Sequence, residues 1–446
     1  MSKYNAKNKK KLSVVMLTFM SAAYLSCFSI SASAADPVIF SFSTIGDTRQ
    51  DPGAGKADKT ALLPPITGTL LPQDAQWLQN THAWARILRT VQSQKANLLF
   101  VNGDMIMGYG RAAVPPTWST TAPATPSDVV NSDLVNFYTQ YAYWRGMVAN
   151  SFETGTYVLP VAGNHEVQCN SANLTTTPVL SRSVCVTGKT AYAENEDAWR
   201  ANMGDLISDL TTNQRFQSVV GTNALNVSGL NATTAPNSIT DSSISTNQAD
   251  LSYSFDIQTA AGLLHFVVIN TDPVGFDSHA PVGWLAADLF NAKSRGAAKF
   301  FVFGHKPAFT YDYLGNGLGT GTAPPQVGIA GLDNDIAGPS GRNIFWQIIA
   351  QYNATYFCGH EHTTKIDQHV DPTNTYTSAN PWQVLVGSGG SPFDPKFGVA
   401  SVSSTDRYYA WATVRVHQSG NVTLDAYGFS DSFGPTQVIQ TIPNLQ

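Results

Sequence analysis

Five short polar motifs in this sequence carry side chains of the types that bind metal ions, and each follows a short apolar run. The motifs are Gly46-Asp47-Thr48-Arg49, Gly103-Asp104, Gly163-Asn164-His165-Glu166, Gly304-His305-Lys306-Pro307 and Gly359-His360-Glu361-His362. Loops that leave the carboxyl ends of strands in an α/β fold converge at one edge of the sheet. Two carboxylates, an amide and several imidazoles delivered in this way predict a cluster of divalent cations.

The segments that must position these motifs read as alternating strands and helices. The apolar runs before the motifs cover residues 38–45, 98–102, 157–162, 300–303 and 355–358. A first helical pattern follows Pro72 and Asp74 and continues from Trp77 to Val91. Further helical patterns cover residues 133–149, 193–210, 282–293 and 343–352. Further strands are expected at 251–257, 263–270, 383–386, 408–416 and 422–427. Strand–helix–strand alternation is typical of crossover units with parallel strands, so the chain is predicted to be α/β.

The five motifs, taken in order, resemble those of the calcineurin-like metallophosphoesterase superfamily. Gly-Asn-His-Glu followed downstream by Gly-His-Glu-His is the most specific part, and the run Trp284-Leu285-Ala286-Ala287-Asp288-Leu289 resembles the helix before the family's fourth motif. The resemblance covers about residues 38–430. It implies a sandwich of two mixed β-sheets flanked by helices, a four-layer αββα fold with a two-metal site at the strand ends.

The resemblance also implies a role for each matching residue. Asp47 and His362 would bind a first metal, Asp104 would bridge both metals, and Asn164, His305 and His360 would bind the second. His165 would protonate the leaving alcohol, a general-acid role that suits an imidazole. The physical chemistry agrees, because two close divalent ions can clamp a phosphoryl group and lower the pKa of a water molecule. Two ions are expected, of Fe, Zn, Mn or Mg, with one tightly bound ion as the alternative.

The first motif departs from the family pattern, which has histidine where this chain has Arg49. Arginine stays protonated and cannot ligate a cation. Three hypotheses follow. Tyr109 or Gln50 completes a two-metal site; or the first metal is weak or absent and Arg49 binds substrate phosphate; or catalysis is lost and the chain is a phosphate- or ligand-binding relative. The purple acid phosphatases also lack that histidine, but their tyrosine position is Met107 here, so the chain is not assigned to that branch.

Other polar residues near the motifs have less specific interpretations. Glu166 and Glu361 could orient metal ligands or serve as plain helix-cap or solvent-facing groups. The run 387–390, Gly-Ser-Gly-Gly, suggests a wall of the site. The remaining histidines match no motif and are interpreted as surface or core residues: His82, His265, His279, His369 and His417.

The N-terminal residues are typical of an export signal. Five lysines precede an apolar stretch at 12–30, and Ala32 and Ala34 fit an Ala-x-Ala cleavage site. A single transmembrane anchor is the alternative, and the small-residue exit favours cleavage near Ala34. We expect residues 1–34 to be removed and 35–446 to form one domain, exported to the periplasm or the extracellular space, with an insertion at about 167–249. No stable membrane anchor is expected.

Charge and cysteine content limit the partners and the compartment. The formal net charge of −5 becomes −10 once the leader with its five lysines is removed, which argues against nucleic-acid binding because that requires basic surfaces. A small phosphoester is the expected partner. Cys169 and Cys185 are predicted to form a disulfide, since an exported chain meets oxidising conditions. Cys358 is predicted to be a buried free thiol.

The sequence therefore predicts an exported, metal-dependent phosphoester hydrolase that acts on phosphomonoesters. A phosphodiesterase acting on nucleotides or phospholipid head groups is the alternative enzyme. The alternative outside enzymes is the phosphate- or ligand-binding relative.

Overall fold

The computed structural model describes residues 36–49, 72–108, 110–112, 133–170, 189–212, 226–232, 244, 246–276, 278–310, 331–332, 339–391, 393 and 408–446. Pro37–Gln446 forms one compact unit. The expected leader, residues 1–34, lies outside the described residues, so its cleavage stays a prediction. Within the described part of the chain, no helix is both long and apolar enough to cross a membrane.

The first sheet joins the start of the chain to its end. Its order is β15-β14-β13-β1-β2-β3. Strands β1, β2 and β3 run parallel to one another. The pairs β1–β13, β13–β14 and β14–β15 are antiparallel. The strands are β1 (Val38–Ile45), β2 (Leu98–Asn102), β3 (Tyr157–Val161), β13 (Tyr408–His417), β14 (Val422–Ser430) and β15 (Gln437–Ile442).

The second sheet comes from the middle of the chain and has the order β11-β12-β10-β9-β8-β7-β6. Strands β8, β9, β10 and β12 run parallel, and the outer pairs are antiparallel. The strands are β6 (Asn226–Asn231), β7 (Tyr253–Thr259), β8 (Gly262–Val268), β9 (Ala297–Phe303), β10 (Thr355–Cys358), β11 (Thr364–Gln368) and β12 (Trp382–Val386).

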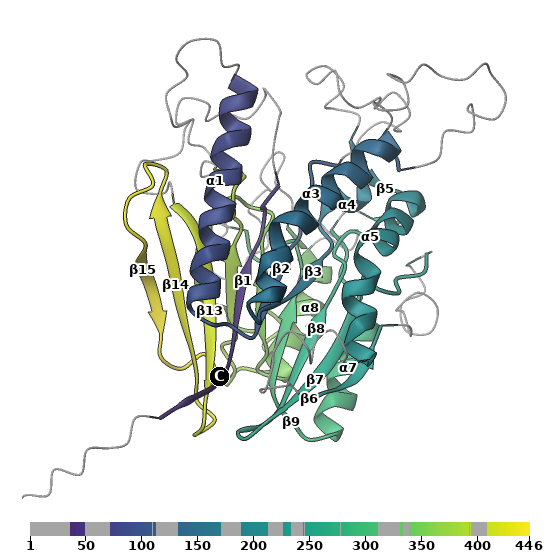
Figure 1. Cartoon of the computed structure of the whole chain (residues 1–446). Coiled ribbons are helices and arrows are strands. Elements are labelled where there is room, and N and C mark those ends of the chain that lie inside the picture. The colour runs from purple at the N-terminus through teal and green to yellow at the C-terminus, as the bar shows by residue number, and fades with distance from the viewer. Residues whose placement is uncertain are drawn as a thin grey trace, which may run out of the picture. The chain divides into compact units, whose positions relative to one another are not determined.

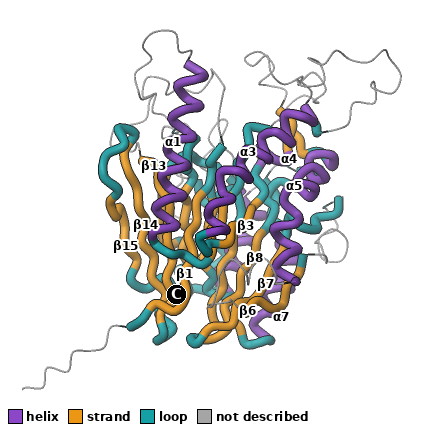
Figure 2. Tube along the Cα trace, viewed as in Figure 1, coloured by secondary structure: helices purple, strands orange, loops and turns teal. Residues whose placement is uncertain are grey.

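Helices cover the outer face of each sheet (Figures 1 and 2). Helices α1 (Pro72–Ser93), α3 (Asp133–Glu153) and α5 (Ala193–Thr212) share a buried cluster with β1, β2 and β3. Helices α7 (Val282–Ser294) and α8 (Pro339–Gln351) share another with β8, β9 and β10. Two mixed sheets between two helical layers confirm the predicted αββα class.

The parallel strands are apolar on both faces because each sheet is buried on both sides. In β2, Leu98 and Phe100 face the other sheet while Leu99 and Val101 face the helices. Phe42 in β1 lies at the centre of the sandwich. Its ring makes edge contacts of 5.0–5.8 Å, between centroids, with phenylalanines of both sheets. Aromatic packing between the sheets therefore sets the spacing of the strand ends.

Some elements differ from the sequence prediction. Strands β6, β11 and β15 were not predicted, nor was the two-stranded sheet of β4 (Gln168–Asn170) and β5 (Lys189–Ala191). Two of these differences fall in the predicted insertion at 167–249. There β6 pairs with β7 at the edge of the second sheet, and α5 packs on the first sheet. The described residues of α5 and β6 in that segment are thus integrated into the layers.

The cysteine predictions have different outcomes. Cys358 is the free thiol among the described residues and is fully buried, which confirms the prediction. Burial raises the pKa of this thiol well above its usual value, so a nucleophilic thiolate is disfavoured. Cys169 is buried in β4. Cys185 lies outside the described residues, so the Cys169–Cys185 disulfide stays a prediction.

A buried ion cluster ties α7 to the second sheet. His265 donates from Nδ1 to Asp256 Oδ1 at 2.6 Å and from Nε2 to Asp288 Oδ2 at 2.9 Å. Arg295 Nε donates to the other oxygen of Asp256 at 2.8 Å. Burial acts to lower the pKa of His265, but its bonds to the two carboxylates outweigh burial and raise it. Asp288, which belongs to the run 284–289, therefore holds His265 in its protonated form. His265 is a core residue, as predicted.

We predict that Asp256→Asn lowers the free energy of unfolding by about 3 kcal/mol, because removing one partner of a buried ion pair leaves the other charge uncompensated. Asp197→Asn, in an exposed pair with Arg200, should change it by less than about 1 kcal/mol. Because the pKa of His265 is raised on folding, its contribution is present below pH ~6.5 and lost as pH rises through the raised value. Urea denaturation measures the free energy of unfolding of both variants, and equal losses in the two would contradict the prediction.

Candidate metal centre

The five motifs meet where the central strands of both sheets end. Asp47 follows β1, Asp104 follows β2, and Asn164 begins the short helix α4 (Asn164–Val167) after β3. His305 follows β9 and His360 follows β10. Asp47, Asp104 and His360 have positive φ angles of 59°, 54° and 73°, a strained conformation for such residues that is common at functional sites. The loops thus turn sharply to bring the side chains together.

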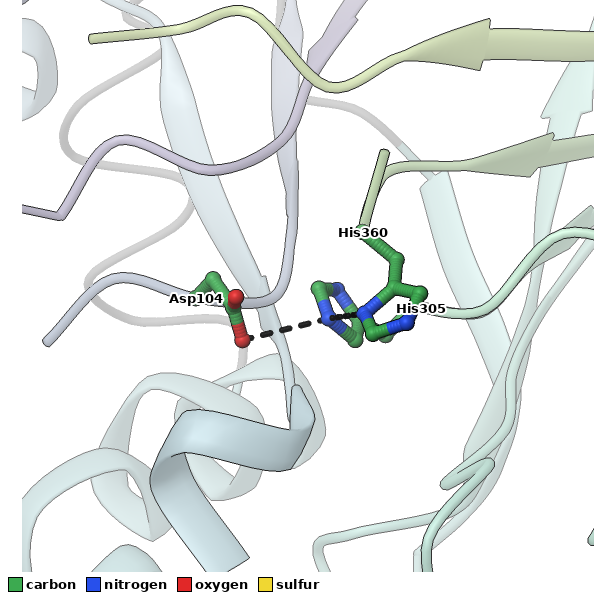
Figure 3. A group of neighbouring side chains, drawn as sticks. All are labelled: Asp104, His305 and His360. Atoms are coloured by element: carbon green, nitrogen blue, oxygen red, sulfur yellow. Dashed lines mark hydrogen bonds and ion pairs between the residues drawn. The ribbon is translucent and has the colours of Figure 1, made fainter. Parts of the chain in front are cut away.

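The ligating atoms form two groups that share Asp104. One group is Asp104, His305 and His360, and the other is Asp47, Asp104 and His362. In each group the ligating atoms lie within 4.8 Å of one another. Figure 3 shows the first group, with the two imidazoles side by side facing the carboxylate. Asp104 is the residue that the two groups have in common.

Asn164 completes the first of these groups. Its Oδ1 lies 2.7 Å from His305 Nε2 and 3.0 Å from His360 Nδ1. A hydrogen bond fixes the orientation of the His305 ring. Its Nδ1 donates to the Asn102 carbonyl at 2.8 Å, so Nε2 faces the site. One carboxylate, one amide oxygen and two imidazoles suit Zn, Fe or Mn. The donor set therefore fits a divalent transition metal.

The second group contains Arg49. Asp47 Oδ1 lies 3.4 Å from His362 Nε2 and 3.5 Å from Arg49 Nη1. The same Nη1 donates to Asp104 Oδ2 at 2.5 Å, and the Arg49 side chain is 2% exposed. Tyr109 and Gln50, the proposed substitute ligands, lie outside the described residues and stay predictions.

His165 lies next to the bridging carboxylate. Its Nδ1 is 2.5 Å from the Met107 carbonyl oxygen, which can only accept, so Nδ1 carries a proton. Nε2 then faces the site, 3.6 Å from Asp104 Oδ2. The Asp104 carboxylate is thus the charged group beside this nitrogen. The geometry can therefore supply a proton donor beside the metal ligands.

Glu166 positions the loop that carries Asp104. Its two oxygens accept four backbone N–H bonds of 2.7–3.0 Å, from Asp104, Met105, Ile106 and Gly163. A Cβ atom on Gly163 would lie 2.5 Å from the Asp104 side chain, so only glycine allows this approach. Glu166 thus holds the backbone that carries Asp104 and, through the Gly163 N–H, also caps the start of α4.

Burial and neighbouring charges shift the pKa values of several side chains at this site. Burial raises the pKa of Glu166 to about 7, with the charge of Asp104 adding to the effect. Burial also raises the pKa of Asp47, against the bond from His362. Asp104 is the exception, because the charges of His165, His305 and Arg49 overcome its burial and hold its pKa well below the usual value. The pKa of His305 is raised to about 9: burial lowers it, but Asp104 more than compensates.

Metal binding requires neutral imidazoles and ionised carboxylates, so it is coupled to the release of protons. Asp104 is already ionised over the working pH range, whereas His305 must lose a proton before it can ligate.

The sequence analysis missed a buried ion pair behind His305. Lys306 Nζ lies 2.6 Å from Asp272 Oδ1 and donates to Ser278 at 2.8 Å. Gln168, just after α4, donates to the same carboxylate oxygen at 3.0 Å. The pair thus connects the His305 loop to the segment that follows the Asn164 motif. The polar run that follows β8, ending in Asp272, was the available signal, since it is another strand end.

The run 387–390 lies against the first motif, as predicted for a wall of the site. The Gly389 N–H donates to the Gly46 carbonyl and the Ser391 N–H to the Asp47 carbonyl, both at 3.0 Å. A Cβ on Gly387 would lie 2.9 Å from Asp47 Oδ2. The segment therefore supports the Asp47 loop.

The sequence matches no established family profile and no curated protein. Solved structures similar to it include a purple acid phosphatase, PPD1, from yellow lupin (Lupinus luteus) seeds, with 12% identity, a TM-score of 0.45 and coverage of 91% of this chain and 53% of that one. A dimetal phosphatase from Danio rerio has 11% identity, a TM-score of 0.41 and coverage of 91% and 99%. PhoD has 12% identity, a TM-score of 0.42 and coverage of 91% and 72%.

The chain thus spans about half the length of the lupin protein.

We predict that Glu166→Gln weakens the affinity for Mn²⁺ by about 10–100-fold, the usual effect of losing a group that orients a metal ligand. An amide keeps one acceptor oxygen and turns an NH₂ group toward backbone N–H donors. Isothermal titration of the metal-free protein with MnCl₂ measures the affinity. Glu153→Gln, at the exposed end of α3, is the matched control. Equal affinities in the two variants would refute the role of Glu166.

Proposed function

We propose that this chain is a metallophosphoesterase that hydrolyses phosphomonoesters with a bound divalent metal. The observation that carries the proposal is the arrangement around Asp104. One of its oxygens, Oδ1, lies 3.1 Å from His305 Nε2, and the other lies 3.6 Å from His165 Nε2. Metal ligands and a proton donor therefore share one buried carboxylate.

The residues that would hold the ion are Asp104, Asn164, His305 and His360. When bound, a divalent ion supplies positive charge to a phosphoryl oxygen and lowers the pKa of a water molecule. Asp47 and His362 line the neighbouring position. Phosphoryl transfer depends mainly on positioning and on stabilising charge on the phosphoryl oxygens, and this cluster gathers the groups that such a reaction requires.

His165 would protonate the leaving alkoxide from Nε2. The Met107 carbonyl holds the ring by Nδ1, so Nε2 is the nitrogen that would exchange a proton with substrate. The Asp104 carboxylate 3.6 Å away stabilises the imidazolium before transfer. Afterwards the ring is neutral, with its remaining proton on Nδ1.

We predict that His165→Ala lowers kcat by about 10²–10⁴-fold, the usual contribution of a general acid. The loss should be smaller for 4-nitrophenyl phosphate than for glycerol phosphate, because nitrophenolate leaves without a proton. Rates with Mn²⁺, Zn²⁺, Fe²⁺ and Mg²⁺ measure this, and bis(4-nitrophenyl) phosphate tests the diesterase alternative. His82→Ala, at an exposed position outside the site, is the control.

Equal losses on the two monoesters would refute the general-acid role. Absence of turnover with every ester and metal, in protein that still binds phosphate, would favour the binding relative.

The proposal includes export of the chain after cleavage near Ala34. It rests on the basic start, the apolar stretch and the small-residue exit of the sequence. Expression of the full chain in a bacterium should give a mature protein that begins at Ala35, read by mass spectrometry of the N-terminal peptide. An intact leader on membrane-bound protein would favour the anchor instead.

A further inference from the structure

Arg49 lies where a first metal ion would bind. Its side chain is 2% exposed, and its Nη1 contacts Asp104 Oδ2 at 2.5 Å and Asp47 Oδ1 at 3.5 Å. The Arg49 backbone N–H also donates to the Asp104 carbonyl at 2.9 Å. Both ends of the residue are thus fixed to the motif that carries the bridging carboxylate.

The two oxygens that Arg49 contacts are those that face the first metal position. Asp47 Oδ1 is the atom 3.4 Å from His362 Nε2. Asp104 turns Oδ1 toward His305, at 3.1 Å, and Oδ2 toward Arg49. The bridging carboxylate therefore offers one oxygen to the group with His305 and the other to the guanidinium.

A guanidinium and a metal ion compete for this place. An ion there would need its oxygen ligands at about 2.0–2.2 Å, on the same Asp104 oxygen that already accepts from Nη1. Arginine stays charged in proteins and has no acceptor for a cation. Repulsion between a divalent ion and a buried positive charge is screened far less than in water.

We propose that the Arg49 guanidinium replaces the first metal ion, so that this chain binds a single divalent ion at Asp104, Asn164, His305 and His360. Arg49 then supplies a positive charge to Asp47 and Asp104 in place of that ion. This assignment differs from a contact with substrate phosphate, because it gives Nη1 to the two carboxylates. The catalytic meaning of the assignment rests on the proposed function, but the number of ions is measured without substrate.

The test counts ions in metal-stripped protein reloaded with Mn²⁺. Titration calorimetry and elemental analysis after dialysis should give one Mn²⁺ per wild-type chain, with the electron paramagnetic resonance signal of an isolated ion. Arg49→His should give two, with a spin-coupled signal, because the charge is removed and a ligand is supplied. Two ions of similar affinity in the wild type, or a single ion in the Arg49→His variant, would overturn the proposal.

Two single substitutions in the wild-type background test the same assignment without altering Arg49. His305→Ala should weaken Mn²⁺ binding at least tenfold, whereas His362→Ala should change it less than threefold, because His362 faces the position that Arg49 fills. Loss of an ion in the His362→Ala variant would overturn the proposal. Circular dichroism establishes that both variants are folded.

The outcomes separate this inference from the proposed function. One ion without hydrolysis of any ester leaves the ion count standing and removes the function. Hydrolysis with two ions per wild-type chain would support the proposed function and overturn the single-ion assignment.

Discussion

The buried carboxylate of Asp104 is the interaction on which the site depends. It lies at the end of β2, 1% exposed, where an isolated charge would be costly. Its charge is tolerated because His305 and Arg49 face its two oxygens from different sides. The His165 backbone N–H donates to Oδ1 at 3.2 Å, and Glu166 fixes the loop beneath. Each neighbouring motif therefore supplies a group that Asp104 requires.

This dependence explains why the fold closes two sheets around one edge. Asp47, Asp104 and Asn164 come from the first sheet, and His305, His360 and His362 from the second. Their separation is set by the aromatic layer around Phe42, which fixes how far apart β2 and β9 end. Rings that interdigitate at native density do not slide easily. The rigid core thus gives the ligands a precision that loops alone would not provide.

The sequence best predicted the buried strands and the polar residues that the structure brings together, for a single reason. Strands β1, β2 and β10 were predicted with their observed bounds because both faces are apolar and the polar motifs mark their ends. Strand β15 was missed because it is an exposed edge strand, and β6 because it is polar. The contact of Arg49 with Asp104 was not predictable from local pattern, since it depends on side-chain direction across residues 55 positions apart.

Replacing a divalent ion by a guanidinium leaves one positive charge in place of two and does not supply the chemistry of a metal. The planar guanidinium of Arg49 can offset part of the charge of Asp47 and Asp104 and fix their positions by hydrogen bonds. They cannot polarise a water molecule as a metal does. Water activation would then fall to one ion, beside the proton donor His165. Arg49 also keeps its charge at every working pH, whereas a metal must displace protons to bind. A permanent cation therefore gives one half of the site an electrostatic balance that does not vary with metal supply.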